Sequence, residues 1–108
     1  NEADPQGRFK LINDSEMEIA PGVKAFWVGA HTPGCQAMEI MTDKGKVILT
    51  SDVCFHYDHI EYEIPIGFIY SLYEWWDAIK NMKGRNPDIM IPSHDVKVFA
   101  NYKNGKIA

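Results

Sequence analysis

Three side chains with metal-binding chemistry stand at turns or at the ends of apolar runs. His31 precedes the turn in "GAHTPGCQ", Asp52 follows the run "VILTS", and His94 follows the run "IMIPS". Imidazoles and a carboxylate form a donor set for zinc, iron or manganese, and the two oxygens of a carboxylate can bridge two cations. Strand ends of layered α/β folds meet at one edge of the sheet. We therefore expect these three residues to lie together.

The elements that would position these residues are mostly strands. Gly, Pro, Asn and Asp separate short apolar segments, as is typical of β structure. His31 then falls in a loop between two strands, and His94 follows a short buried strand. The last segment, residues 96–108, is expected to close as a hairpin around Asn104 and Gly105. Further strands are predicted at residues 8–12, 17–20, 23–28, 35–42 and 46–51.

One main helix is predicted at about residues 68–83. Apolar residues recur there at spacings of three and four, Lys80 and Lys83 lie in the last turn, and Gly84 suits the position after the helix. The aromatic residues of this pattern are expected to face the core. The apolar positions are Ile69, Leu72, Tyr73, Trp76, Ile79 and Met82. Residues 52–67, which precede the helix, are predicted to form a long irregular loop.

Composition indicates one folded domain over residues 1–108. Hydrophobic residues make up 45% of the chain and charged residues 24%, which is the balance of a globular protein. A net charge of −4 without a basic stripe argues against nucleic-acid binding. The chain has neither a membrane-spanning apolar run nor a secretory pattern, so a cytoplasmic protein is expected. Cys35 and Cys54 are interpreted as reduced thiols.

Three motifs in a fixed order resemble a known family. "HTPG" after a strand, "VILTSD" with its aspartate at a strand end, and "IPSHD" after the helix resemble the second half of the metallo-β-lactamase superfamily of metal-dependent hydrolases. The resemblance runs from about Val23 to Val96. It implies an α/β (α+β) fold that forms the C-terminal half of an αββα sandwich.

The resemblance also implies roles for the candidate residues. His31 would bind one metal ion and His94 a second, while Asp52 would bridge both and steer the proton released during catalysis. The complete site would hold two zinc ions, with iron or manganese as alternatives. A metal-bound hydroxide would attack the carbonyl of a lactone or ester. Asp95 is either a carboxylate that supports the ligands or a turn residue.

Within the superfamily, the segment "SDVCFHYDHIEYEIPIG" is most similar to N-acyl-homoserine lactonases. Glyoxalase II-like thioesterases are the alternative enzyme class. The resemblance implies a small-molecule acyl substrate, in a pocket lined by Phe55, His56 and Tyr57. The lactonases carry a tyrosine three residues after the bridging aspartate, whereas this sequence has Phe55 at that position.

The first-half signature of the superfamily, His-x-His-x-Asp-His, has no counterpart in this sequence. "HYDH" at residues 56–59 has similar letters but follows Asp52, so a chance match is preferred. The start at Asn1, without Met, favours a truncated or processed chain. We therefore expect a missing N-terminal half, or a companion chain, to complete the site, which leaves open whether this chain is active alone.

A second hypothesis is a non-catalytic interaction module that retains the half-fold. Trp75, Trp76 and the tyrosines would then form a protein-binding patch. Under the first hypothesis, of a chain that lacks its N-terminal half, the half-sandwich leaves one sheet face uncovered, and we expect the chain to aggregate or to form homo-oligomers through that face.

Overall fold

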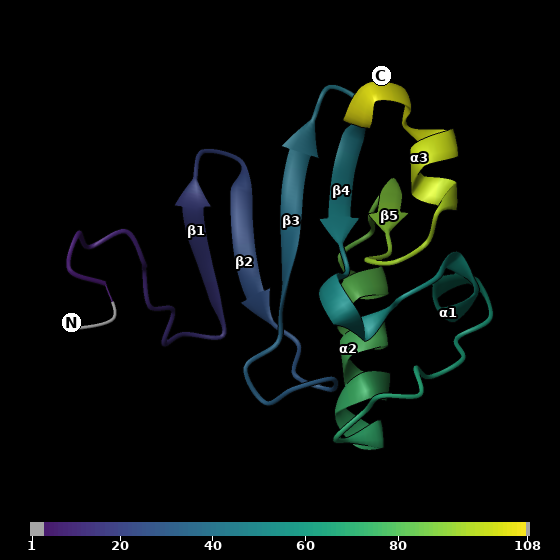
Figure 1. Cartoon of the computed structure of the whole chain (residues 1–108), viewed down its shortest axis with the longest axis horizontal. Coiled ribbons are helices and arrows are strands. Elements are labelled where there is room, and N and C mark those ends of the chain that lie inside the picture. Colours follow the sequence, from purple (N-terminus) through teal and green to yellow (C-terminus); the bar gives the residue numbers. More distant parts are fainter. Residues whose placement is uncertain (1–3, 108) are drawn as a thin grey trace.

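A mixed five-stranded sheet forms the body of the protein in the computed structural model, which describes residues 4–107. Its strands lie side by side in chain order (Figure 1). The first four form an antiparallel meander, whereas the fifth pairs in parallel with the fourth. The strands span Glu16–Ala20 (β1), Val23–Trp27 (β2), Gln36–Thr42 (β3), Gly45–Leu49 (β4) and Ile89–Ile91 (β5).

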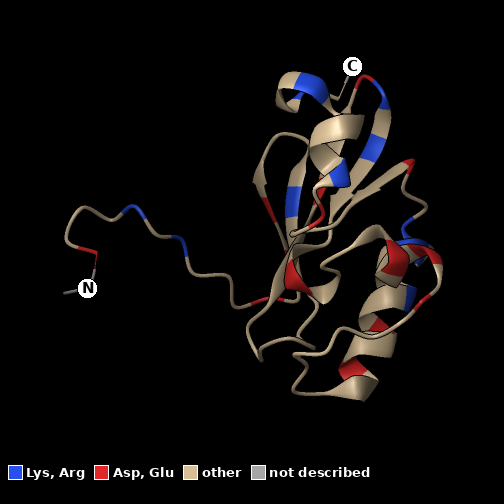
Figure 2. Cartoon of the chain, turned by 45° about the vertical axis from the view of Figure 1, so that its right-hand side comes forward, with Lys and Arg blue, Asp and Glu red and all other residues tan. Residues whose placement is uncertain are grey.

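The strands predicted at residues 17–20, 23–28, 35–42 and 46–51 are confirmed, with small shifts at their ends. The strand predicted at residues 8–12 is wrong, because this segment belongs to an arm that leads away from the sheet (Figure 2). The Asp4 carboxylate accepts the backbone N–H groups of Arg8 at 2.8 Å and Phe9 at 2.7 Å. Such local side-chain to backbone bonds compete with the pairing of a strand.

Helix α2, Leu72–Gly84, connects β4 to β5 and covers one face of the sheet. The Ser71 hydroxyl caps its first turn by accepting the Glu74 N–H at 3.2 Å. The prediction of a helix from residue 68 therefore starts it too early. The backbone N–H groups of Tyr70 and Ser71 donate to the Ala30 carbonyl at 2.9 and 3.3 Å, which ties this part of the chain to the loop after β2.

The buried face of α2 differs from the predicted aromatic stripe. Tyr73 is 87% exposed and Trp76 is 37% exposed, whereas Trp75 is fully buried and its Nε1–H donates to the Val53 carbonyl at 2.8 Å. Burial of Trp75 also removes it from the predicted protein-binding patch. The helix residues that face the sheet are Trp75, Ala78, Ile79 and Met82, and they pack in one cluster with Phe26, Val28, Ala37, Ile48 and Val53.

The predicted C-terminal hairpin is wrong. The segment forms helix α3, Lys97–Asn101, followed by the 3₁₀ turn Lys103–Gly105. The Asp95 carboxylate accepts the N–H of Lys97, the first residue of α3, at 2.9 Å, and such a local side-chain to backbone bond favours a turn over a strand. Asn104 and Gly105 both have positive φ, so a tight turn forms there without flanking strands.

Two smaller differences concern the ends of the main helix and the loop before it. Gly84 lies inside α2, and Arg85 occupies the C-cap. The segment 52–67, predicted as irregular, contains the short helix α1, Tyr57–Glu61. Among residues 4–107, no helix is long and apolar enough to cross a membrane.

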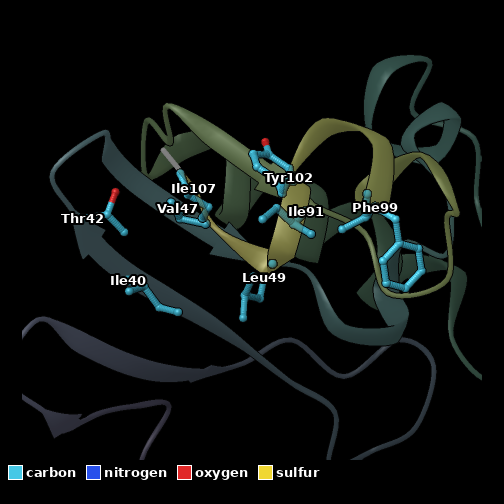
Figure 3. Close-up of a pocket in the computed structure, with 10 residues that line it drawn as sticks. Ile40, Thr42, Val47, Leu49, Ile91, Phe99, Tyr102 and Ile107 are labelled. Carbon is cyan, nitrogen blue, oxygen red and sulfur yellow. The ribbon is translucent and has the colours of Figure 1, made fainter.

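The sheet face opposite α2 is apolar and only partly covered. Helix α3 and the end of the chain lie over it and leave a cavity of about 280 Å³ (Figure 3). Phe99 of α3 is nevertheless 80% exposed. The cavity is lined mainly by Ile40, Thr42, Val47, Leu49 and Ile91 from the sheet and by Val98, Tyr102 and Ile107 from the C-terminal segment.

Candidate metal centre

His31, Asp52 and His94 lie together at one edge of the sheet, as their places in the sequence predict. His31 comes from the loop between β2 and β3, Asp52 from the 3₁₀ turn after β4, and His94 from the segment after β5. Asp52 Oδ2 is 3.7 Å from His31 Nε2, and Asp52 Oδ1 is 3.1 Å from His94 Nε2. Each imidazole therefore faces a different oxygen of one carboxylate.

The turn that carries Asp52 is fixed by the strand beside it. Thr50 is fully buried, and its N–H donates to the Ile91 carbonyl of β5 at 3.0 Å. Ser51 has a φ of +54°, a conformation that costs a non-glycine residue on the order of 1 kcal/mol or more. The surrounding hydrogen bonds hold this turn in place, and it directs Asp52 toward the two imidazoles.

The Asp52 and His94 segments are joined by main-chain hydrogen bonds. The Ser93 N–H donates to the Cys54 carbonyl at 3.0 Å, and the His94 N–H donates to the Phe55 carbonyl at 2.9 Å. This backbone pairing fixes the position of the main chain at His94 relative to the segment that follows Asp52.

The loop that carries His31 requires a glycine. Gly29 has a φ of +62°, and a Cβ at this position would lie 2.6 Å from Cζ2 of Trp27. Ala30 follows with a φ of +67°. The Trp27 Nε1–H donates to the Pro33 carbonyl at 2.7 Å, which closes the loop. Only a residue without a side chain allows this approach of ring and backbone.

The tautomer of His31 follows from its hydrogen bond. Its Nδ1 lies 2.6 Å from the Phe68 carbonyl oxygen, which can only accept, so Nδ1 carries a proton. In the neutral ring, Nε2 then has its lone pair free and faces Asp52 Oδ2. Orientation of a metal-binding imidazole through its other ring nitrogen is the usual arrangement at metal sites.

The donor set fits a transition metal but is incomplete. In the neutral ring two acceptor atoms, His31 Nε2 and Asp52 Oδ2, face each other at 3.7 Å, a spacing that suits a shared cation. His94 Nε2 donates a proton to Asp52 Oδ1, and metal binding would displace that proton. Within residues 4–107, no three His, Cys, Asp or Glu side chains are placed to hold a metal ion by themselves. Further ligands are required.

Both cysteines are free and buried. Burial raises the pKa of the Cys54 thiol to about 12. Because metals bind the thiolate, a thiol that stays protonated at neutral pH is a poor ligand. Cys54 therefore contributes to the site through its backbone carbonyl.

Asp95 connects the segments around the site. Its Oδ1 accepts the Lys97 N–H at 2.9 Å and its Oδ2 accepts the Tyr57 N–H at 3.0 Å. These two bonds, the one from Lys97 first, hold the pKa of the Asp95 carboxyl below its usual range. Asp95 thus holds the first residues of α3 and α1. The structure therefore shows it in the role of a turn residue, one of the two predicted roles.

The three residues predicted to line a substrate pocket point in different directions. The Phe55 ring lies beside His31 and His94, with centroid distances of 5.7 and 5.1 Å. His56 is exposed at the N-cap of α1. Tyr57 lies close to Tyr102, whose pKa is raised by burial and by this neighbour. Their contact with a substrate stays a prediction.

Sequence reasoning missed two contributors to the site. The Phe68 carbonyl fixes His31, but a main-chain acceptor has no signature in the residue type. The sequence favours a chance match for the segment that holds His59, yet the His59 ring also packs against Phe55, at a centroid distance of 6.3 Å. The three-residue spacing of His56 and His59 is the feature of the sequence that could have pointed to His59.

Comparison with known proteins shows which proteins the chain is similar to. No family model matches the sequence. The chain is 33% identical to an N-acyl homoserine lactonase of Bacillus sp and 32% identical to one of Bacillus cereus; 91% of the chain is aligned in each case. It spans 42% of the length of these curated relatives.

A solved structure agrees with the sequence relatives. An N-acyl homoserine lactone hydrolase with the product N-hexanoyl-L-homoserine bound at its catalytic metal centre superposes with a TM-score of 0.73 and 27% identity, over 83% of this chain and 37% of that one. The mixed α and β fold with its five-stranded sheet is thus that of the metallo-β-lactamase superfamily. Within this superfamily the chain is a homologue of the N-acyl homoserine lactonases.

Proposed function

We propose that this chain contributes His31, Asp52 and His94 to the binuclear metal centre of a hydrolase that opens N-acyl homoserine lactones. The observation that carries the proposal is the Asp52 carboxylate, which presents one oxygen to each imidazole, at 3.7 and 3.1 Å. The lactonase relatives, and a solved neighbour with an acyl-homoserine product at its catalytic metal centre, support it.

The residues of this chain would act as follows. His31 and His94 would each bind one ion through Nε2, and Asp52 would bridge the two. Bound zinc, iron or manganese would activate water and polarise the lactone carbonyl. Water adds to the carbonyl carbon, the ring C–O bond breaks, and an N-acyl homoserine with a free carboxylate and hydroxyl is formed. Asp52, whose carboxylate faces both imidazoles, would take up and return the proton of the attacking water.

The remaining ligands would come from protein outside this chain. The relatives are more than twice as long as the aligned segment, which covers 42% of them. The apolar sheet face with its cavity of about 280 Å³ provides a surface for such a part of the protein to cover. This supports a missing half of the domain, on the same polypeptide or on a companion chain.

A chimera tests the proposal directly. This chain would replace the aligned 42% of the Bacillus sp lactonase. We expect native mass spectrometry to find two transition-metal ions per chimera, and a pH-stat assay to record acid released from N-hexanoyl homoserine lactone. Asp52→Asn should abolish both signals, because the bridging charge is lost. Asp43→Asn, in the exposed turn between β3 and β4, is the matched control and should change neither.

Two outcomes would reject the proposal. A folded chimera that binds no metal would show that His31, Asp52 and His94 are not ligands. A metal-loaded chimera that cleaves an acyl thioester but not the lactone would favour the glyoxalase II-like alternative. Circular dichroism of each variant separates loss of the site from loss of the fold.

A further inference from the structure

The four histidines of the chain gather in one aromatic cluster around Phe55. The rings of His31, His59 and His94 contact the Phe55 ring at centroid distances of 5.7, 6.3 and 5.1 Å. All three are nearly perpendicular to it, at 79°, 82° and 81°. The fourth histidine, His56, lies 5.6 Å from His59. One phenyl ring is therefore the common neighbour of three imidazoles.

Within residues 4–107, each of these imidazoles makes one side-chain hydrogen bond, and His31 in addition faces Asp52 Oδ2 at 3.7 Å. His31 Nδ1 donates to the Phe68 carbonyl at 2.6 Å, and His59 Nδ1 donates to the Ile64 carbonyl at 2.7 Å. His94 Nε2 donates to Asp52 Oδ1 at 3.1 Å. A hydrogen bond at one ring nitrogen restrains rotation of the imidazole about its Cβ–Cγ bond only while that single bond is made. A packed neighbour adds to this restraint, and the Phe55 ring is such a neighbour in all three cases.

Phe55 is itself held firmly enough to serve this purpose. Its ring packs against the buried core cluster, and its carbonyl accepts the His94 N–H at 2.9 Å. The preceding residue, Cys54, is fully buried. Perpendicular aromatic contacts direct the positive edge of one ring to the negative face of another, so an aromatic ring orients its neighbours in a way that an aliphatic side chain does not.

We propose that Phe55 is a positioning residue that fixes the ring planes of His31 and His94 on the two sides of Asp52. Through His59 the same ring couples the segment from α1 to Ile64 to this site. The effect of fixed ring planes on metal affinity rests on the proposed function. The order of the rings itself is a property of the chain without metal.

The first experiment is made on the metal-free 108-residue chain. Carbon-13 relaxation of the imidazole rings in the unmodified chain should show His31, His59 and His94 as ordered and the exposed His56 as more mobile. Phe55→Leu keeps an apolar side chain but removes the aromatic ring, so the three ordered imidazoles should become mobile and lose their ring-current shifts. Phe55→Tyr retains the ring and should preserve both properties. Phe9→Leu, on the exposed N-terminal arm, is the matched control.

The second experiment measures zinc affinity of the lactonase chimera by competition with a chelator. Phe55→Leu should weaken zinc binding about tenfold or more, as loss of a supporting residue does at metal sites. Phe55→Tyr and Phe9→Leu should bind zinc as the unmodified chimera does. If Phe55 had only a structural role, Phe55→Leu would lower the stability of the chimera. It would not show a loss of zinc affinity that the aromatic ring of Phe55→Tyr prevents.

The outcomes separate the two proposals. If the imidazoles of Phe55→Leu stay ordered, or if those of Phe55→Tyr become mobile, the positioning role is rejected. If the unmodified chimera takes up no zinc while the imidazoles respond to Phe55→Leu as described, the proposed function fails and the positioning role stands. If Phe55→Leu does not fold, the test is the comparison of ring mobility in the unmodified chain. Equal mobility of the His56 ring and the other three imidazole rings would reject the proposal.

Discussion

One face of the sheet is closed by α2, whereas the opposite face is closed only in part, by α3 and the end of the chain. On the first face, Trp75 and Ile79 of α2 belong to one buried cluster with residues of β2 and β4. On the second face, comparable apolar side chains line an open cavity. The chain thus completes the layer on one side of its sheet by itself and leaves the apolar face on the other side partly open.

The largest expected difference between the two faces is in side-chain burial. Trp75→Ala should lower the free energy of unfolding by about 3–5 kcal/mol, because the ring is fully buried and its Nε1–H is hydrogen-bonded. Phe99→Ala, which removes a ring that is 80% exposed over the other face, should change it by no more than about 0.5 kcal/mol. Urea unfolding followed by circular dichroism measures both values. Similar losses would show that α3 closes its face as tightly as α2 does.

A charge placed on the open face should reduce self-association of the chain. Ile40 and Met41 are neighbours on β3 and point to opposite faces, and only Ile40 lines the cavity. Ile40→Lys should raise the dissociation constant of dimers about tenfold, or about 1.4 kcal/mol, as measured by sedimentation velocity. Met41→Lys, at a side chain that is 57% exposed, is the control and should leave association unchanged. Equal effects would mean that association does not use the open face.

The smallest expected effect concerns an ion pair at the edge of the closed face. Arg85 at the end of α2 pairs with Glu16 of β1, and this hydrogen bond, followed by the charge of Arg85, holds the pKa of Glu16 below its usual value. A lowered pKa gives stability that is present above the unfolded-state pKa and is lost as pH falls through the folded-state pKa. Because the Glu16 side chain is 41% exposed, the contribution at neutral pH should stay below about 1 kcal/mol.

Thermal unfolding at low salt, from pH 7 down to pH 3, tests this contribution. Glu16→Gln should be less stable than the unmodified chain at pH 7, and the two should converge in acid. Glu61→Gln, on exposed α1, should follow the unmodified chain throughout. A difference for Glu16→Gln that persists at pH 3 would contradict an origin in the charge of Glu16.

The sequence predicts the meander well because its signals are local. Alternating apolar residues and the turns at Gly22 and Gly45 specify β1 to β4 without reference to distant parts of the chain. The start of α2 is less predictable, since residues 68–70 have an apolar pattern but are tied to the Ala30 carbonyl, far away in the sequence. The prediction of a C-terminal hairpin failed for a local reason, because the Asp95 carboxylate accepts the N–H of Lys97, the first residue of α3.

The candidate site shows the same limit. The grouping of His31, Asp52 and His94 is predictable because each follows a strand and strand ends meet at one edge. The contacts that orient these side chains are not, since they come from the Phe68 carbonyl and from the aromatic ring of Phe55. A main-chain acceptor cannot be recognised from the residue type, and a phenylalanine in a sequence is interpreted first as a core residue.

The main-chain pairing between residues 54–55 and 93–94 has a consequence for evolution of the site. The N–H groups of Ser93 and His94 donate to the carbonyls of Cys54 and Phe55, so the bonds that set the position of His94 survive a change of side chain at position 93. The Ser93 side chain is exposed. Mutation and selection can therefore alter the surface beside His94 while the main-chain position of His94 is inherited unchanged.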